Sequence, residues 1–169
     1  YTVEALARGG VGQLDLIDND TVSRSNINRQ ILATHSTVGL PKVEAGRNRI
    51  LDINPNAVVN THPIFYTPET AGQLQLSDYD YIVDAIDCVT TKILIAEWAR
   101  DHSVPLIASM GTGNKLDPSR FEVTDISKTS GCPLARVMRK ELKNRGVSHH
   151  PVVFSPEEPM EATQSIRHI

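Results

Sequence analysis

Short apolar runs alternate with helix-like segments along the first 110 residues of the chain. The patterns predict strands over 13–17, 57–61, 79–86 and 105–110, and helices over 1–8, 41–53, 67–76 and 90–102. Strands separated by helices are typical of βαβ units, in which a crossover helix joins two parallel strands. The chain is therefore predicted to be an α/β protein with a Rossmann-like, mostly parallel sheet flanked by helices.

A different pattern follows beyond residue 115. Residues 121–126 alternate as a half-exposed strand does, residues 134–145 repeat apolar side chains at helical spacing, and residues 151–154 form another apolar run. These segments predict a small α+β C-terminal extension. Because the sequence has no internal repeat and no low-complexity linker, we expect residues 1–169 to form a single domain.

Composition narrows the class of protein. An apolar content of 40% and a charged content of 22% are typical of a soluble globular chain. The two cysteines cannot build a disulfide framework, and they do not form the CxxC pairs of a four-thiolate zinc site. Because there is no disulfide framework, the expected location is the cytoplasm; no apolar stretch reaches membrane-spanning length. The net charge of −3 argues against an obligatory polyanion partner for the chain as a whole.

Two aspartates, Asp18 and Asp87, come directly after predicted strands. Ligands of open parallel sheets bind outside the carboxyl ends of the strands, so both carboxylates are placed where a ligand would lie. Asp18 suits the two hydroxyls of a ribose, and Asp87 suits a magnesium ion, or its water shell, on a polyphosphate. Taken singly, either acid is better explained as a cap of the following helix or turn.

A polar segment after the first strand supplies groups that would bind phosphate. It contains Asn26 and Arg29, and Lys42 follows at short range. The Arg29 guanidinium matches phosphate oxygens in two-point contact, whereas Lys42 is a point charge. Arg29, Lys42 and Asp87 are the predicted catalytic residues, because attack at an α-phosphate needs neutralised charge as pyrophosphate leaves. One carboxylate for a ribose, together with two cations for phosphates, indicates ATP and Mg²⁺ rather than a dinucleotide. The alternative interpretation of Arg29 and Lys42 is that they are surface cations without a ligand.

The glycine run at residues 9–12 is not interpreted as a phosphate-binding loop. Such a loop follows a strand and opens a helix, whereas this run follows a predicted helix and precedes a predicted strand. It is expected to end the helix and form a turn.

The cysteines and histidines have plain structural explanations. Cys88 neighbours Asp87 and could be a nucleophile, but a small buried residue at a strand end is favoured. Cys132 has no evident histidine or acid partner nearby in sequence. His149 and His150 precede a proline and are interpreted as loop residues, since no further metal ligands accompany them.

A basic stripe runs along the predicted helix 134–145. Residues 128–145 hold six cations against one acid. The stripe lies about half a turn from the apolar stripe, which comprises Leu134, Val137, Met138 and Leu142. A solvated helix face and an RNA-backbone contact explain it equally well. The candidate RNA-binding residues are Arg136, Arg139, Lys140 and Lys143.

Taken together, these motifs resemble the adenylating domain of the ubiquitin-activating-enzyme superfamily, which includes bacterial relatives in thiamine and molybdopterin biosynthesis. The resemblance covers residues 1 to about 110. It implies that Asp18 binds ribose, that Asp87 serves magnesium and phosphate, and that a glycine-rich phosphate loop precedes Tyr1. The residues implied for the triphosphate are Asn26, Arg29, Gln30 and Lys42. The matching segments are 10–12, 18–22, 25–30, 38–42, 53–56 and 83–87.

Within that superfamily the chain looks most similar to the tRNA threonylcarbamoyladenosine dehydratases. The supporting segments are 84–87 with Lys92, 117–118, 123–129, 133–142 and 153–155. The resemblance implies a homodimer that uses ATP to cyclise the threonylcarbamoyl group of a tRNA adenosine, through an acyl-adenylate or an acyl-phosphate. It also implies C-terminal residues that the sequence does not show.

Other functions remain open at this stage. The same ATP site would serve adenylation of the C-terminal glycine of a ubiquitin-like or sulfur-carrier protein, which makes such a carrier a possible partner. An NAD-binding domain would use Asp18 on the ribose, but it gives no reason for the cations that follow. A catalytically silent docking subunit is the third alternative.

Overall fold

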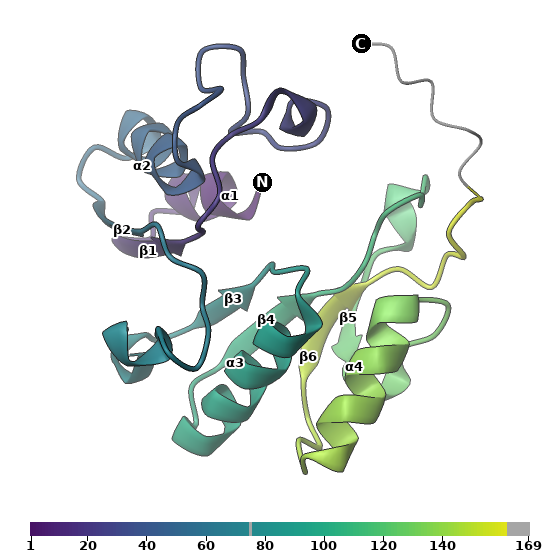
Figure 1. The fold of residues 1–169 in the computed structure, drawn as a ribbon. Helices are drawn as coiled ribbons and strands as arrows, with labels where there is room; N and C mark the ends of the chain where they lie inside the picture. Colours follow the sequence, from purple (N-terminus) through teal and green to yellow (C-terminus); the bar gives the residue numbers. More distant parts are fainter. Residues whose placement is uncertain (75, 162–169) are drawn as a thin grey trace. The chain divides into compact units, whose positions relative to one another are not determined.

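The computed structural model describes residues 1–74 and 76–161. The chain divides into two compact units, Tyr1–Gly72 and Gln73–Ile169, and each is considered by itself (Figure 1). That one domain spans residues 1–169 stays a prediction. No helix in the described ranges is long and apolar enough to cross a membrane.

The first unit pairs two parallel strands with two helices. Its elements are α1 (Thr2–Arg8), β1 (Gln13–Ile17), the 3₁₀ helix η1 (Arg24–Asn26), α2 (Lys42–Ile53) and β2 (Val58–His62). The register places Gln13 opposite Val58 and Ile17 opposite His62. Helix α2 is the crossover between the strands, and a small apolar core lies beneath the helices. That core comprises Ala7, Leu14, Ile50 and Ala57.

Three glycines explain the local geometry of this unit. Helix α2 lies so close to β1 that a Cβ on Gly46 would sit 2.8 Å from Leu16 Cδ1. Gly9 ends α1, and Gly10 follows at φ +84°, a left-handed conformation that glycine adopts without strain. The interpretation of residues 9–12 as a helix end and turn is therefore confirmed.

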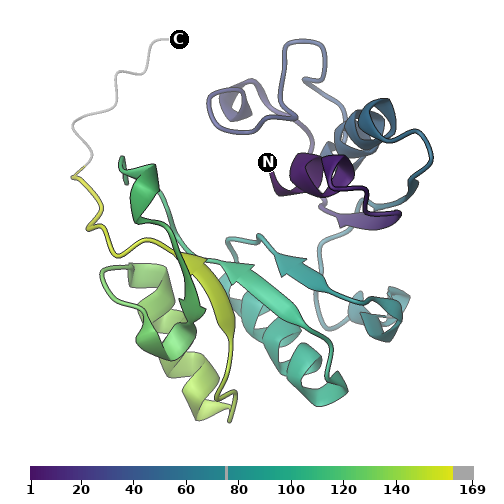
Figure 2. The same ribbon diagram turned by 180° about the vertical axis from the view of Figure 1, so that it is seen from behind.

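The second unit is a four-stranded sheet with two helices on one face (Figures 1 and 2). Its elements are β3 (Ile82–Asp84), α3 (Val89–His102), β4 (Leu106–Ser109), β5 (Glu122–Asp125), α4 (Pro133–Asn144) and β6 (Pro151–Phe154). The strand order is β3-β4-β6-β5, in which β5 alone runs antiparallel to its neighbour. Ala108 and Val152 of the sheet meet Met138 and Leu142 of α4 in a fully buried core.

The predicted fold class, mostly parallel α/β with a helix-flanked sheet, is confirmed, but some details were wrong. The described residues of the range 67–76 do not form the predicted helix. Instead, turns lead to the 3₁₀ helices η2 (Ala71–Gln73) and η3 (Leu76–Asp78). Strand β3 is shorter than the predicted 79–86, because the Asp84 side chain accepts a hydrogen bond from Ile86 N and starts a turn. Val137, assigned to the apolar stripe of α4, is 45% exposed.

Candidate nucleotide-binding site

A backbone clasp joins the end of β1 to the start of α2. Thr21 and Pro41 form an isolated antiparallel bridge. Val22 N donates to Leu40 O at 2.8 Å, and Lys42 N donates to Asp20 O at 2.9 Å. Gly39, at φ +91°, lets the chain turn back into this bridge. The clasp brings together two motifs that lie about twenty residues apart in the sequence.

The clasp places one ammonium group against two carboxylates. Lys42 Nζ lies 2.6 Å from Asp20 Oδ2 and 3.7 Å from Asp18 Oδ2. Asp18 Oδ1 also accepts a hydrogen bond from Asp20 N at 2.8 Å. The Asp18 side chain is 39% exposed, so its carboxylate remains accessible to a ligand. The predicted ribose acid and the predicted phosphate cation are therefore neighbours.

The segment between the two halves of the clasp orders its own polar side chains. Asn26 is buried, and its side-chain oxygen accepts from Ser23 N at 2.9 Å in a capping box. Arg29 is exposed, and its Nη1 donates to Ser25 O and to Asn28 Oδ1. Gln30 is half-buried. Arg29 is thus the predicted phosphate-binding side chain that this segment presents to solvent, whereas Asn26 shapes the turn.

Asp87 lies in the second unit, in the turn between β3 and α3. Its side chain is exposed, and it directly precedes the N-cap residue of α3. It follows the carboxyl end of a parallel strand, as predicted.

A buried ion pair supports this turn, and the residue-level sequence analysis missed it. Lys92 and Asp84 are both fully buried, with Lys92 Nζ 3.0 Å from Asp84 Oδ2. The same ammonium donates to Ile86 O at 3.0 Å and to Ser109 O at 2.9 Å. It therefore ties the turn that carries Asp87 to the end of β4. An acid ending an apolar strand and a lysine between Thr91 and Ile93 were the available signals.

Cys88 caps helix α3 and is half-buried. Hydrogen bonds from the backbone N–H and the side chain of Thr91 stabilise the thiolate and lower the pKa of Cys88. Cys132 is buried and caps α4 by accepting from Ala135 N. Both cysteines thus occupy N-cap positions at helix starts.

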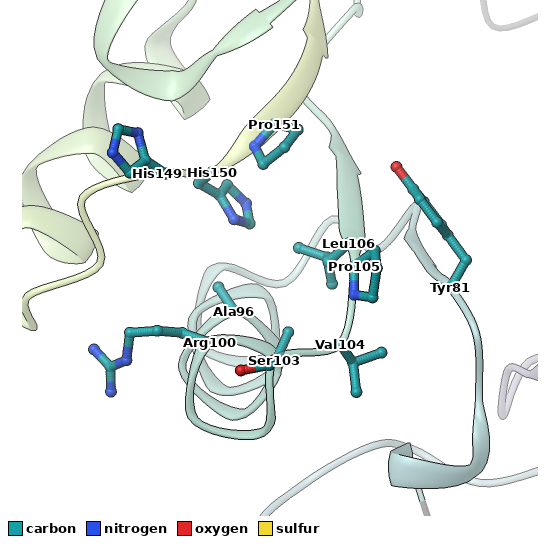
Figure 3. Close-up of a pocket in the computed structure, with 11 residues that line it drawn as sticks. Tyr81, Ala96, Arg100, Ser103, Val104, Pro105, Leu106, His149, His150 and Pro151 are labelled. Atoms are coloured by element: carbon teal, nitrogen blue, oxygen red, sulfur yellow. The ribbon is translucent and has the colours of Figure 1, made fainter.

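A pocket of about 350 Å³ opens at the amino ends of the strands of this sheet (Figure 3). Leu106 and Pro151, which begin β4 and β6, line it together with Tyr81, Arg100 and His150. Asp87 follows the carboxyl end of β3, whereas the pocket lies at the amino ends of the strands. The pocket therefore does not include the predicted nucleotide-binding residue of this unit.

His150 is expected to make the second unit sensitive to acid. It is 2% exposed, and burial lowers the pKa of its imidazole below 6.5, while the charge of Asp84 opposes the shift. The folded state therefore holds His150 neutral where the unfolded chain binds a proton, so the free energy of unfolding falls as the pH drops below about 6.5. Urea unfolding at about pH 7.5 and about pH 5.5 measures this loss.

The control for His150 is its neighbour. His150→Gln is expected to flatten the pH dependence of the urea midpoint. His149→Gln leaves the dependence in place, because His149 is 90% exposed. An unchanged slope in the His150 variant would contradict the prediction.

The four candidate RNA-binding residues of α4 do not behave alike. Arg139 is half-buried, and its Nη1 donates to both Thr129 O and Thr129 Oγ1 at 2.6 Å. Its guanidinium thus anchors α4 to the preceding loop. The other three, Arg136, Lys140 and Lys143, are exposed.

Comparison with known proteins decides the family. The profile of the ThiF family matches residues 1–154. The chain belongs to the ThiF family. The resemblance to the adenylating superfamily is therefore confirmed. Individual relatives show which members of the ThiF family the chain is similar to.

Two bacterial relatives of this ThiF chain are tRNA threonylcarbamoyladenosine dehydratases. That of Bacillus subtilis (strain 168) is 44% identical over 168 residues, covering 99% of this chain and 66% of the relative. That of Escherichia coli (strain K12) is 41% identical over 144 residues, covering 85% of this chain and 54% of the relative. The chain thus spans between about half and two thirds of the length of these relatives.

Solved structures agree with this placement in the ThiF family. The E. coli dehydratase TcdA in complex with ATP matches with a TM-score of 0.88 and 38% identity, covering 94% of this chain and 69% of that chain. The same enzyme in complex with AMP matches with a TM-score of 0.89 and 39% identity, covering 95% and 69%. The predicted resemblance to the dehydratases is confirmed.

Proposed function

We propose that the protein containing this chain is an ATP-dependent enzyme that cyclises threonylcarbamoyladenosine in tRNA. The observation that carries the proposal is the clasp, which sets Lys42 beside Asp18 at the end of β1. A carboxylate for the ribose and an adjacent cation for the phosphates fit a nucleoside triphosphate. The identity to named dehydratases supports the choice of reaction.

The side chains divide the work on the nucleotide. Asp18 accepts hydrogen bonds from the ribose hydroxyls, while Arg29 and Lys42 bind the phosphate oxygens. Gln30 adds a hydrogen bond to a phosphate oxygen. Asn26 acts mainly by fixing the turn before Arg29, because its oxygen is already bonded to Ser23 N.

The second unit offers an exposed carboxylate whose chemistry suits Mg²⁺. Among the described residues, no group of three histidine, cysteine or acidic side chains converges on one point. Mg²⁺ commonly binds through one or two carboxylates, with phosphate oxygens and water completing its shell. Asp87, exposed at the carboxyl end of β3, is the carboxylate we assign to it. The ion would neutralise phosphate charge there.

The chemistry needs activation because a free carboxylate is a poor electrophile. The substrate carboxylate attacks the α-phosphorus of ATP, the bond to the departing pyrophosphate breaks, and an acyl-adenylate forms. Lys42 and Arg29 stabilise the negative charge that develops on the leaving group. The carbamoyl oxygen then attacks the activated carbonyl, AMP leaves, and a proton is released. Since both reacting groups belong to one nucleoside, ring closure requires no enzyme nucleophile.

The test is mass analysis of tRNA nucleosides after incubation of the full-length protein with ATP, Mg²⁺ and modified tRNA. The modified nucleoside is expected to become lighter by one water molecule. An unchanged nucleoside together with carrier-dependent pyrophosphate exchange would replace this proposal by activation of a ubiquitin-like or sulfur-carrier protein.

The proposal extends to the oligomeric state of the protein and to its compartment. We expect a cytoplasmic homodimer, because the superfamily resemblance implies a dimer. Sedimentation of the full-length protein at a dimer mass supports it, and a monomer at working concentration overturns it.

A further inference from the structure

Three cations share the outer face of α4. Arg136, Lys140 and Lys143 follow the spacing i, i+4, i+7, which places them on one side of a helix. All three are exposed, and within the described ranges their side chains make no hydrogen bond or ion pair. We call these three residues the α4 basic face.

The neighbouring charges do not neutralise this face. Glu141 is the acid of helix α4, and its carboxylate binds Arg145 at 2.5 Å. Arg145 also lies 3.8 Å from Glu97 of α3. Glu141 and Glu97 thus pair with Arg145, and no described acid forms an ion pair with the three cations.

Helix stability does not account for the whole face. Cations are favourable near a helix C-terminus, which explains Lys143 in the last turn. Arg136 lies near the N-terminal end, where the helix dipole disfavours a cation, and the first turn holds no acid. A charge placed against the dipole and exposed to solvent is consistent with an external anion.

We propose that the α4 basic face binds an RNA phosphate backbone. The three cations extend along about 10 Å of helix, at intervals comparable to those of successive phosphates. Such contacts give affinity and position without base preference. That the RNA is the substrate tRNA rests on the proposed function, whereas the surface itself does not.

An anionic membrane is the competing polyanion, and the packing of α4 disfavours it. Helices that bind at a membrane surface bury an apolar face among the lipids. The apolar face of α4 is already used, because Met138 and Leu142 are fully buried in the core of the second unit.

The test compares two charge-matched variants of the full-length protein in tRNA binding without ATP. Lys140→Glu/Lys143→Glu is expected to weaken binding on the order of tenfold and to reduce the slope of log K against log salt by about two. The control, Arg47→Glu/Arg120→Glu, reverses two exposed cations of α2 and η4 (Pro118–Arg120) and is expected to bind like the parent.

The outcomes are separable. Equal tRNA binding by the two double variants overturns the proposal. Binding to anionic vesicles is measured in parallel, and a Lys140→Glu/Lys143→Glu variant that loses vesicle binding but keeps tRNA binding also overturns it. If the glutamate variant unfolds, Lys140→Gln/Lys143→Gln serves in its place. Because binding is measured without ATP, an inactive parent protein overturns the proposed function and leaves this surface standing.

Discussion

Replacing Lys92 by methionine is expected to destabilise the protein by about 3–5 kcal/mol, because the variant keeps a fully buried carboxylate without its cation. Methionine preserves most of the side-chain length, so the loss reports charge rather than volume. The Ile86 and Ser109 carbonyls lose a donor at the same time. Urea unfolding of the full-length protein near pH 7 measures the change.

The double variant separates the ion pair from its surroundings. Lys92→Met/Asp84→Asn leaves no buried charge at this position, so it is expected to recover a large part of the stability that Lys92→Met loses. Asp84→Asn alone strands the ammonium and is expected to cost about as much as Lys92→Met. Independent, additive losses from the two single variants would refute the coupling.

Replacing Lys42 by alanine is expected to reduce kcat/KM for ATP-dependent turnover by about 10²–10³-fold, with stability changed by less than about 1 kcal/mol. Its partners are exposed, with 60% of the Asp20 side chain accessible, so the pair contributes little to folding. The loss is instead expected in the step that expels pyrophosphate. Steady-state kinetics with varied ATP and thermal unfolding measure the two quantities.

Arg47→Ala is the control for Lys42→Ala. Arg47 lies on the same helix, is exposed, and is expected to leave turnover near the parent value. If Lys42→Ala turns over at the parent rate with saturating ATP, Lys42 has no role in the chemical step.

Local chemistry explains which parts of the fold could be predicted. Strand β1 and strand β6 were predicted with their observed bounds, because β1 lies between Gly12 and Asp18 and β6 begins at Pro151. The structure of the segment from Thr67 to Asp78 could not be predicted, since side chains such as Thr70 form local hydrogen bonds that compete with a helix. Thr70 Oγ1, for example, accepts from Thr67 N and donates to Phe65 O.

The candidate site was predictable in part for the same reason. Asp18, Arg29 and Lys42 could be nominated from their residue type and from their position in short sequence motifs. The partners of those side chains were not readable, because they depend on a bridge between Thr21 and Pro41. The Asp84–Lys92 pair needed the three-dimensional structure, since it joins a strand, a helix and the carbonyl of a second strand.

The bridge at Thr21 and Pro41 has an evolutionary consequence. The chain leaves and re-enters the βαβ scaffold at adjacent points, so the excursion bearing Arg29 is a loop with closely spaced ends. Changes at its exposed positions are expected to be tolerated, whereas Ile27 and Ala33 pack with Ala45 of α2 and tie the loop to the scaffold. Sequence variation among relatives is therefore expected at the exposed residues of this loop, while the scaffold that presents Asp18 and Lys42 persists.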